Sequence, residues 1–267
     1  MSVEDILATL GLPPNVGPER EKAILQAVLD DKAEVVWADI SNTYKDHTAT
    51  FHVFADALKI SGVRVNVSAE TEQHIADAIG CMLLTPLLAD LMWVQAAVHI
   101  EPRPRPITAS TQAMVEHSLD IDKQLAALGN PTGLIQTVGK HWVIDEPLAS
   151  NPSKAMNYGW HFKGAAFQGL HGEVVASLMK DASGAYLRLI QGRGTAHDMH
   201  HSDYSQTCCL VARECEVDGG PADLEEILKD PELAPLASAS GKLSVLRQPG
   251  VEIGVIGATV FGTVPST

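Results

Sequence analysis

The hydrophobic and polar residues of the first half of the chain are spaced as in helices. The pattern predicts helices over residues 3–10, 18–30, 69–80, 86–98 and 109–128, and a shorter one over 221–230. Ser68 is suited to cap the third of these helices, and Thr85 with Pro86 to begin the fourth. The fourth helix is apolar on nearly all sides, so we expect it to be buried.

Runs of β-forming residues appear in the first half and dominate the second. The runs "TATFHVFADALKI" (48–60) and "VRVNV" (63–67) predict two paired strands. From residue 134 onward, short apolar runs alternate with glycine-rich turns. The last two runs, "GKLSVLRQ" (241–248) and "VEIGVIGATVFGTV" (251–264), also predict strands.

Helices therefore come first and strands later, which is typical of the α+β class. We expect a helical N-terminal half packed on a mostly antiparallel β-sheet. No stretch has the composition of a flexible linker. Residues 1–267 are therefore predicted to form a single domain, helix-rich over 1–130 and strand-rich over 131–267.

The net charge narrows the classes of partner. It is −14 at pH 7, and an acidic surface repels nucleic acids and anionic membranes. No apolar run reaches the roughly 18 residues that a membrane helix needs, and the first residues do not resemble a signal peptide. We expect no nucleic-acid partner and no membrane span, and a protein that is cytoplasmic or exported without a cleaved signal peptide.

The four cysteines, Cys81, Cys208, Cys209 and Cys215, include no CxxC pair. A structural zinc site of the ribbon type is therefore not indicated. Cys81 precedes a predicted helix, and a cysteine followed later by a histidine is the order of papain-like hydrolases, but its apolar neighbours favour a buried thiol. We expect free, mostly buried thiols in a reducing compartment.

Three histidines, two aspartates, a tyrosine and two serines fall within residues 197–205. An aspartate near a histidine orients an imidazole as a general base, or supplies a mixed oxygen and nitrogen metal site. His197 and Asp203 are the predicted centre of such a site. The alternative is a solvated loop in which Asp203 bonds backbone amides where a strand begins.

A second candidate histidine lies in the run "AMNYGWHF" (155–162). As a strand, this run places Asn157, Gly159 and His161 on one face and its aromatic residues on the other. His161 is expected to complete the His/Asp site from a neighbouring strand. The alternative is a half-buried strand histidine bonded to a carbonyl group.

Known catalytic signatures are missing from the sequence. It contains neither an HExxH metal motif nor a G-x-S-x-G nucleophile motif. Ser205 is therefore expected to form hydrogen bonds rather than to act as a nucleophile. Lys140 follows a glycine, but the upstream glycines of a phosphate loop are missing, which predicts an ordinary surface residue.

Several runs together resemble an uncharacterised bacterial protein family with "YGWH", "IQ", a histidine and "DYSH" in this order. The matching residues are 158–161, Ile190-Gln191, His197 and 203–205, and residues 70–93 resemble a further stretch of the family. The likeness covers about residues 45–240. Members of the family occur beside peptidoglycan-binding modules, so the resemblance implies a cell-wall context without a settled activity.

The chain departs from this family at several positions. Gln206 stands where the family has the histidine of "DYSH", Leu84 replaces a proline, and no arginine precedes Leu210. Residues 164–188 are additional. The missing histidine keeps a non-catalytic alternative open.

We expect a hydrolase that acts on an amide or glycosidic bond in cell-wall (peptidoglycan) material. The substrate would be a small molecule or a cell-wall polymer, and the sequence specifies no oligomeric state. The alternatives are a non-catalytic binding or structural module, phage-like or cell-wall-associated, with a degenerate site, and a purely structural hydrogen-bond network. The predicted catalytic residues, which would also bind zinc if a metal is needed, are His197, Asp203 and His161, and the predicted substrate-binding residues are Gln191, Tyr204, Ser205 and Trp160.

Overall fold

The structure, a computed structural model, describes residues 2–106, 109–163, 177–180 and 184–253. The helices predicted from the sequence are confirmed to within three residues at each end. None of the helices in the described ranges is both long and apolar enough to cross a membrane. The α-helices are α1 (Val3–Leu10), α2 (Pro18–Leu29), α3 (Ala69–Ile79), α4 (Pro86–Gln95), α5 (Thr111–Ala127) and α6 (Leu224–Lys229), and the 3-10 helices are η1 (Glu146–Ser150) and η2 (Ala234–Leu236).

Hydrogen bonds confirm the two predicted helix starts. The Ser68 side chain accepts a bond from the Thr71 N–H at 3.2 Å, and the Thr85 side chain accepts one from the Leu88 N–H at 3.1 Å. Pro86 occupies the first turn of α4. Backbone N–H groups in a first turn have no partner within the helix, so the missing N–H of proline costs no helical hydrogen bond.

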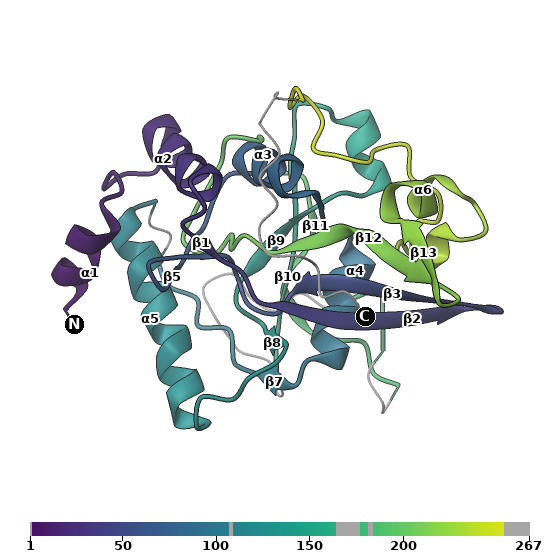
Figure 1. Cartoon of the computed structure of the whole chain (residues 1–267), viewed down its shortest axis with the longest axis horizontal. Helices are drawn as coiled ribbons and strands as arrows, with labels where there is room; N and C mark the ends of the chain where they lie inside the picture. Colours follow the sequence, from purple (N-terminus) through teal and green to yellow (C-terminus); the bar gives the residue numbers. More distant parts are fainter. Residues whose placement is uncertain (1, 107–108, 164–176, 181–183, 254–267) are drawn as a thin grey trace.

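The largest sheet has five strands in the order β13-β12-β3-β2, with β6 paired to β12. β2 and β3 form a hairpin with continuous register, and it extends to the right in Figure 1. The strands are β2 (Trp37–Tyr44), β3 (His47–Phe54), β6 (Cys81–Leu83), β12 (Leu210–Val217) and β13 (Gly220–Asp223).

A three-stranded sheet, in the order β11-β10-β9, lies under α4, which packs against β10. Its strands are β9 (Lys140–Val143), β10 (Met156–His161) and β11 (Leu189–Gly194). Among the named strands, only the ladder of β7 (Val98–His99) with β8 (Ile135–Gln136) is parallel within the described ranges. The remaining short strands, β1 (Ala33–Glu34), β4 (Lys59–Ile60) and β5 (Val63–Arg64), form a separate antiparallel sheet.

The α+β class and the mostly antiparallel pairing are confirmed, but a helical N-terminal half is not. β2 and β3 lie in the first half, and β3 pairs with β2 and β12. The predicted pairing of the runs at 48–60 and 63–67 is confirmed only at their adjoining ends, where β4 pairs with β5. Residues 241–248 do not form the predicted strand. Most of the predicted strand over 251–264 lies outside the described residues.

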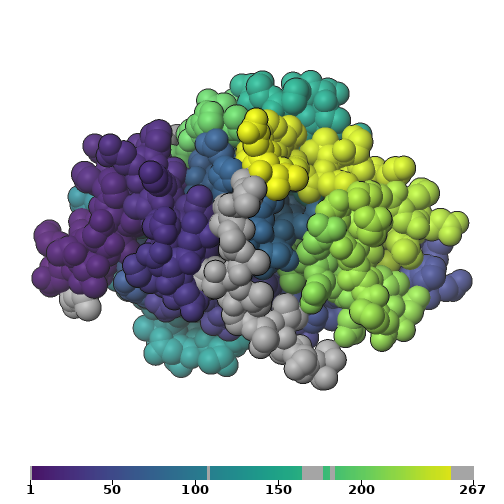
Figure 2. Space-filling model, turned by 45° about the horizontal axis from the view of Figure 1, so that its top comes forward, coloured from purple at the N-terminus to yellow at the C-terminus, as the bar shows by residue number. Residues whose placement is uncertain are grey.

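One continuous cluster of buried apolar side chains includes residues from Leu10 to Leu243, and therefore from both halves of the chain. Figure 2 shows the N-terminal residues in purple and the residues after 210 in green and yellow on either side of a blue segment. α3 packs against both α2 and β6, so it connects the N-terminal helices to the large sheet.

The outer edge of β2 is held by a side chain of α4. The Gln95 amide donates to the Ser41 carbonyl at 2.7 Å and accepts from the Ser41 N–H at 2.9 Å. The backbone of Ser41 is thereby satisfied on the side of β2 where no further strand pairs within the described ranges.

Glu72 of α3 is a carboxyl group inside the core. Its Oε1 accepts from the Cys209 N–H at 3.1 Å, and within the described residues Oε2 has no hydrogen-bond partner. Burial raises the pKa of Glu72 well above 4.5, which outweighs the lowering by the Cys209 N–H. At pH values between the pKa of the unfolded chain and the higher pKa of the folded protein, Glu72 is therefore protonated in the folded protein and ionised in the unfolded chain.

We expect Glu72→Gln to stabilise the protein increasingly as the pH rises above 4.5. A raised folded pKa means that the native stability of the wild type falls with rising pH, by about 1.4 kcal/mol for each pH step of one between the unfolded and folded pKa. Glutamine resembles the protonated acid and removes this loss. Urea unfolding at pH 5, 7 and 8 measures the difference. Glu214→Gln, at an exposed position on β12, serves as the control. A stability difference that does not grow with pH would contradict the raised pKa.

Candidate functional site

The loop between β11 and β12 carries the predicted His/Asp site, and Asp203 is its most heavily bonded side chain. Its Oδ1 accepts from the Ser205 N–H at 2.8 Å and from the Ser205 hydroxyl at 2.5 Å, as an aspartate at a turn does. Its Oδ2 pairs with Lys140 Nζ at 3.3 Å and lies 3.8 Å from His201 Nε2. The carboxylate is thus buried and faces basic side chains.

These partners keep Asp203 charged. Burial alone would raise the pKa of its carboxyl group, but the interactions with His201, Lys140 and Ser205 outweigh burial and hold the pKa well below 3.8. Gln206 Oε1 accepts from the Asp203 N–H at 2.5 Å. A fixed negative charge therefore lies at the base of the loop.

His197 joins this group by stacking on His201. The ring centroids are 3.8 Å apart and the planes differ by 8°, and both rings meet Trp142 edge-on at 6.3 and 6.5 Å. Burial, His201 and Lys140 lower the pKa of His197 below 6.5. Because His197 is only partly buried, solvent reaches a neutral imidazole that can accept a proton.

Residues far away in the sequence position Asp203. Asn66 Nδ2 donates to the Asp203 carbonyl and to Ser202 Oγ. Arg20 of α2 is fully buried, and its Nη2 donates to the Asn66 carbonyl at 2.8 Å and to Asn66 Oδ1 at 2.6 Å. The N-terminal helices therefore contribute to the geometry of the loop.

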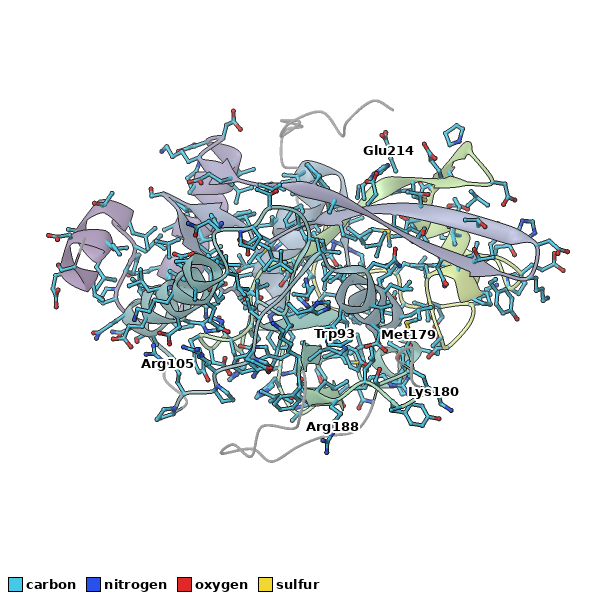
Figure 3. The ribbon with its side chains drawn as sticks, turned by 90° about the horizontal axis from the view of Figure 1, so that it is seen from below. Trp93, Arg105, Met179, Lys180, Arg188 and Glu214 are labelled. Atoms are coloured by element: carbon cyan, nitrogen blue, oxygen red, sulfur yellow. The ribbon has the colours of Figure 1, made fainter. Side chains whose placement is uncertain are left out.

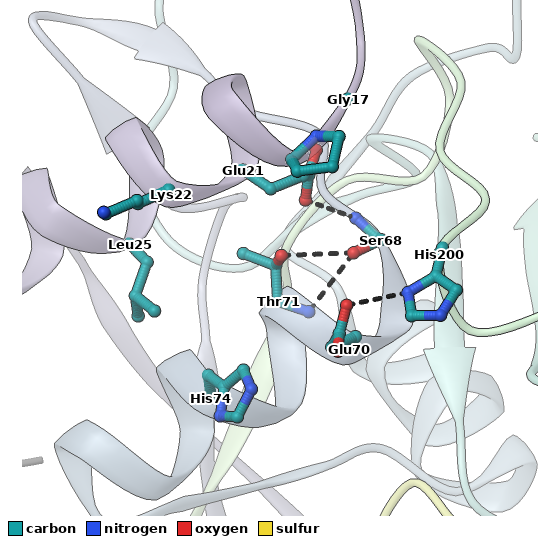
Figure 4. A pocket seen from close by; sticks show the side chains of 10 residues that line it. Gly17, Glu21, Lys22, Leu25, Ser68, Glu70, Thr71, His74 and His200 are labelled. Atoms are coloured by element: carbon teal, nitrogen blue, oxygen red, sulfur yellow. Dashed lines mark hydrogen bonds and ion pairs between the residues drawn. The ribbon is translucent and has the colours of Figure 1, made fainter. Parts of the chain in front are cut away.

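A pocket of about 450 Å³ lies between α2, α3 and this loop (Figure 4), within the size range of small-molecule sites. Glu70 lines the pocket and is hydrogen-bonded to the loop. Its N–H donates to the Met199 carbonyl at 3.0 Å, and its carboxylate pairs with His200 Nδ1 at 2.8 Å. The other lining residues are Gly17, Pro18, Glu21, Lys22, Leu25, Ser68, Thr71 and His74.

His161 is bonded to Asp90 of α4 instead of to the loop. Its Nε2 lies 2.6 Å from Asp90 Oδ1, and the Tyr158 hydroxyl donates to the same oxygen at 2.9 Å. Tyr158 and His161 therefore lie on the same side of β10, which corrects the predicted alternation. The cause is the backbone at Gly159 and Trp160, whose φ angles of 107° and 61° interrupt the strand geometry.

The predicted zinc set of His161, His197 and Asp203 is not assembled. His161 is bonded to Asp90, whereas Asp203 is bonded to Lys140. Across the part of the chain that the structure describes, no three His, Cys, Asp or Glu side chains are arranged to hold a metal ion. The three predicted ligands therefore do not converge on one place in the structure.

Two predicted substrate-binding residues are buried together. Trp160 and Tyr204 belong to an apolar cluster, with ring centroids 6.3 Å apart. The Tyr204 hydroxyl donates to the Arg105 carbonyl at 3.1 Å and accepts from the Arg105 N–H at 2.5 Å. These rings therefore fasten the loop to the interior and present no exposed surface to a substrate.

The other two predicted substrate-binding residues differ in exposure. Ser205 is buried and spends its hydroxyl on Asp203. Gln191 is partly exposed, lies opposite Gly159 in the β10–β11 ladder, and donates to the Gly192 carbonyl at 2.7 Å. Gln191 is therefore partly open to solvent, whereas the hydroxyl group of Ser205 is bonded to the Asp203 carboxylate.

All four cysteines are free and buried, as predicted. Burial raises the pKa of Cys215 to about 12 and raises that of Cys81 further. A thiol with a raised pKa is a poor nucleophile at neutral pH. The structural interpretation of Cys81 is thereby supported.

Sequence reasoning missed Lys140 and Asp90. Lys140 was expected at the surface, but it pairs with Asp203 across 63 positions, which no local pattern reveals. Asp90 did carry a signal, because it is the only charged residue in an otherwise apolar predicted helix. A buried carboxylate needs a partner, so its position alone indicates a polar residue opposite it.

Comparison with known proteins assigns no role to these residues. No protein-family model, no curated protein and no solved structure matches the chain.

Proposed function

We propose that the protein is a hydrolase that cleaves an amide or glycosidic bond in cell-wall (peptidoglycan) material. One observation carries the proposal: a charged carboxylate, Asp203, lies between Lys140 and the stacked imidazoles of His197 and His201 at a partly exposed loop. Perturbed titratable groups that converge in this way are typical of catalytic sites.

In this mechanism His197 is the general base. Its lowered pKa keeps the imidazole neutral at pH 7, so it accepts a proton from a water molecule that attacks the substrate. The Asp203 carboxylate stabilises the positive charge that then forms on the stacked pair. The Lys140 ammonium group is placed to stabilise negative charge on the substrate oxygen, and the proton passes from His197 to the leaving group.

The pocket beside the loop favours a substrate that extends beyond the scissile bond. His200 lines this pocket and is a near neighbour of His197 in the same loop. A sugar or peptide unit bound between α2 and α3 would hold the scissile bond against the loop, and such positioning contributes strongly to rate. The cell-wall assignment itself comes from the resemblance in the motifs.

We expect purified peptidoglycan to release new fragments with the wild type, and the rate to fall at least about 100-fold in His197→Gln and Asp203→Asn, which is the lower range for loss of a general base. Mass spectrometry of the soluble fraction measures the release. His47→Gln, at a distant ion pair on the β2–β3 hairpin, is the matched control. A parallel digest with a chelator tests the zinc that the sequence predicts.

A second function, a non-catalytic cell-wall binding module, is favoured by Gln206. Its carbonyl oxygen bonds the Asp203 N–H, so the residue that replaces the family's histidine holds the backbone and carries no titratable group. Co-sedimentation with peptidoglycan without any fragment release would favour this function. If the protein neither releases fragments from peptidoglycan nor co-sediments with it, the cell-wall assignment is overturned.

A further inference from the structure

The pocket beside the loop is formed by facing sides of two helices. Lys22 and Leu25 are three positions apart in α2 and therefore lie on one side of that helix. Glu70 and His74 are four positions apart in α3 and lie on the side that lines the same pocket. Figure 4 shows the α2 pair on one side of the pocket and Glu70 with His200 on the other. The pocket, of about 450 Å³, thus has basic and acidic side chains at different sides.

The α2 side of the pocket has an unpaired positive charge. Lys22 is exposed, and its ammonium group forms no hydrogen bond or ion pair with any residue that the structure describes. The neighbouring acid, Glu21, is already neutralised. Its Oε1 pairs with Arg20 Nη1 at 3.1 Å, and its Oε2 accepts from the Ser68 N–H at 2.9 Å. An anionic group that enters the pocket therefore finds Lys22 as its partner.

The α3 side has a carboxylate with unused acceptor capacity. Glu70 Oε2 pairs with His200 Nδ1 at 2.8 Å, whereas Glu70 Oε1 has no partner in the described ranges. A carboxylate accepts several hydrogen bonds, so a cationic group can pair with Glu70 beside His200. One turn further along α3, His74 Nδ1 is buried and has no hydrogen-bond partner in the same ranges. An unpartnered buried polar atom at the wall of a pocket is typical of a site that a ligand or water fills.

The lining residues favour a peptide over a sugar. Apart from the two imidazoles, the described residues that line the pocket include no aromatic ring, and they include no Asn or Gln side chain. The hydroxyl groups of a sugar are best matched by amide side chains, which both donate and accept, and its apolar face by an aromatic ring. Charges of opposite sign beside Pro18 and Leu25 instead match a short chain that has a carboxylate, an ammonium group and an apolar part.

We propose that this pocket binds the peptide part of peptidoglycan, through a carboxylate group at Lys22 and an ammonium group at Glu70. Pro18 and Leu25 contact the apolar part between the two charged groups. The inference rests on the proposed function, because it identifies the bond that the neighbouring loop cleaves as an amide of the peptide rather than a glycosidic bond.

Isothermal titration calorimetry tests the binding, with γ-D-glutamyl-meso-diaminopimelic acid as the probe. This dipeptide carries both ammonium and carboxylate groups. We expect saturable binding to the wild type, and at least about tenfold weaker binding to Lys22→Gln and Glu70→Gln, because each substitution removes one charged partner of the ligand. Two exposed positions outside the pocket provide matched controls that should bind like the wild type. They are Lys32→Gln, just after α2, and Glu214→Gln on β12, labelled in Figure 3.

Acetylation of the probe separates the two charged contacts. The N-acetylated dipeptide has no ammonium group, so it should bind the wild type at least about tenfold more weakly than the unmodified probe. Glu70→Gln should not weaken it further, whereas Lys22→Gln should. If Glu70→Gln weakened the binding of both probes equally, the assignment of the ammonium group to Glu70 would be overturned.

Binding and cleavage are measured separately, so this proposal and the hydrolase function can fail separately. A wild type that does not bind the probe, or a Lys22→Gln variant that binds it equally well, would overturn the peptide site, even if peptidoglycan is cleaved at a glycosidic bond. Equal binding of N,N′-diacetylchitobiose, an uncharged sugar, would also overturn it. Probe binding that is weakened in both variants, without any fragment release, would support the peptide site and overturn the hydrolase function.

Discussion

Replacing Asp90 by alanine is expected to lower the free energy of unfolding by about 3–5 kcal/mol, the usual cost of removing one partner from a buried charged cluster. Four donors lose their acceptor at once: His161, Tyr158, Ser177 and the Leu178 N–H. Because His161 and Tyr158 are fully buried, water cannot replace the bonds without entering the core. Urea unfolding followed by circular dichroism measures the change.

Asp46→Ala is the matched control, because Asp46 is exposed in the β2–β3 turn, and surface changes of this kind stay within about 0.5 kcal/mol. The buried polar cluster would be of little structural importance if the two variants unfolded at similar urea concentrations.

The second large expected effect is a loss of native stability at acidic pH, caused by two buried neutral histidines. Burial lowers the pKa of His117 to about 4 and that of His141 to about 3, whereas both take up protons near 6.5 in the unfolded chain. The unfolded state therefore binds more protons below pH 6.5, and native stability falls as the pH decreases through this window. Each histidine accounts for roughly 3 kcal/mol by pH 4, because each fall of one in pH costs about 1.4 kcal/mol.

Thermal unfolding between pH 7 and pH 4 measures this transition. His117→Gln and His141→Phe should each flatten the curve below pH 6.5, even if their stability at pH 7 differs from that of the wild type. His47→Gln is the control, and its effect on the pH dependence should have the opposite sign, because the hydrogen bond that His47 donates to the Asp218 carboxylate raises the pKa of His47. A wild type that is equally stable at pH 7 and pH 4 would show that these rings are already accessible to protons in the folded state.

The helices could be predicted because their signals are local. Ser68 and Thr85 cap helices through bonds to residues three positions away. β2 offered no such signal, because only Ile40 among its eight residues is buried, so the strand lacks apolar alternation. Its place in the sheet depends on β3, and not on its own pattern.

The difference between local and long-range interactions also explains which residues of the site could be predicted from the sequence. His197 and Asp203 could be found because they lie in one short loop. The partner of His161 lies 71 positions away in α4, and no spacing rule connects them. The alternation rule failed at β10 because Gly159 and Trp160 have positive φ angles, which a strand pattern does not predict.

The amide of Gln95 acts as a one-residue substitute for a neighbouring strand. By bonding both polar groups of Ser41, it occupies the place where the backbone of another molecule would otherwise pair with β2. Open strand edges are the usual starting points of intermolecular sheet growth. A single side chain of α4 thus protects the middle of the longest hairpin from self-assembly, beside a strand whose one acidic residue, Asp39, is bonded to His52.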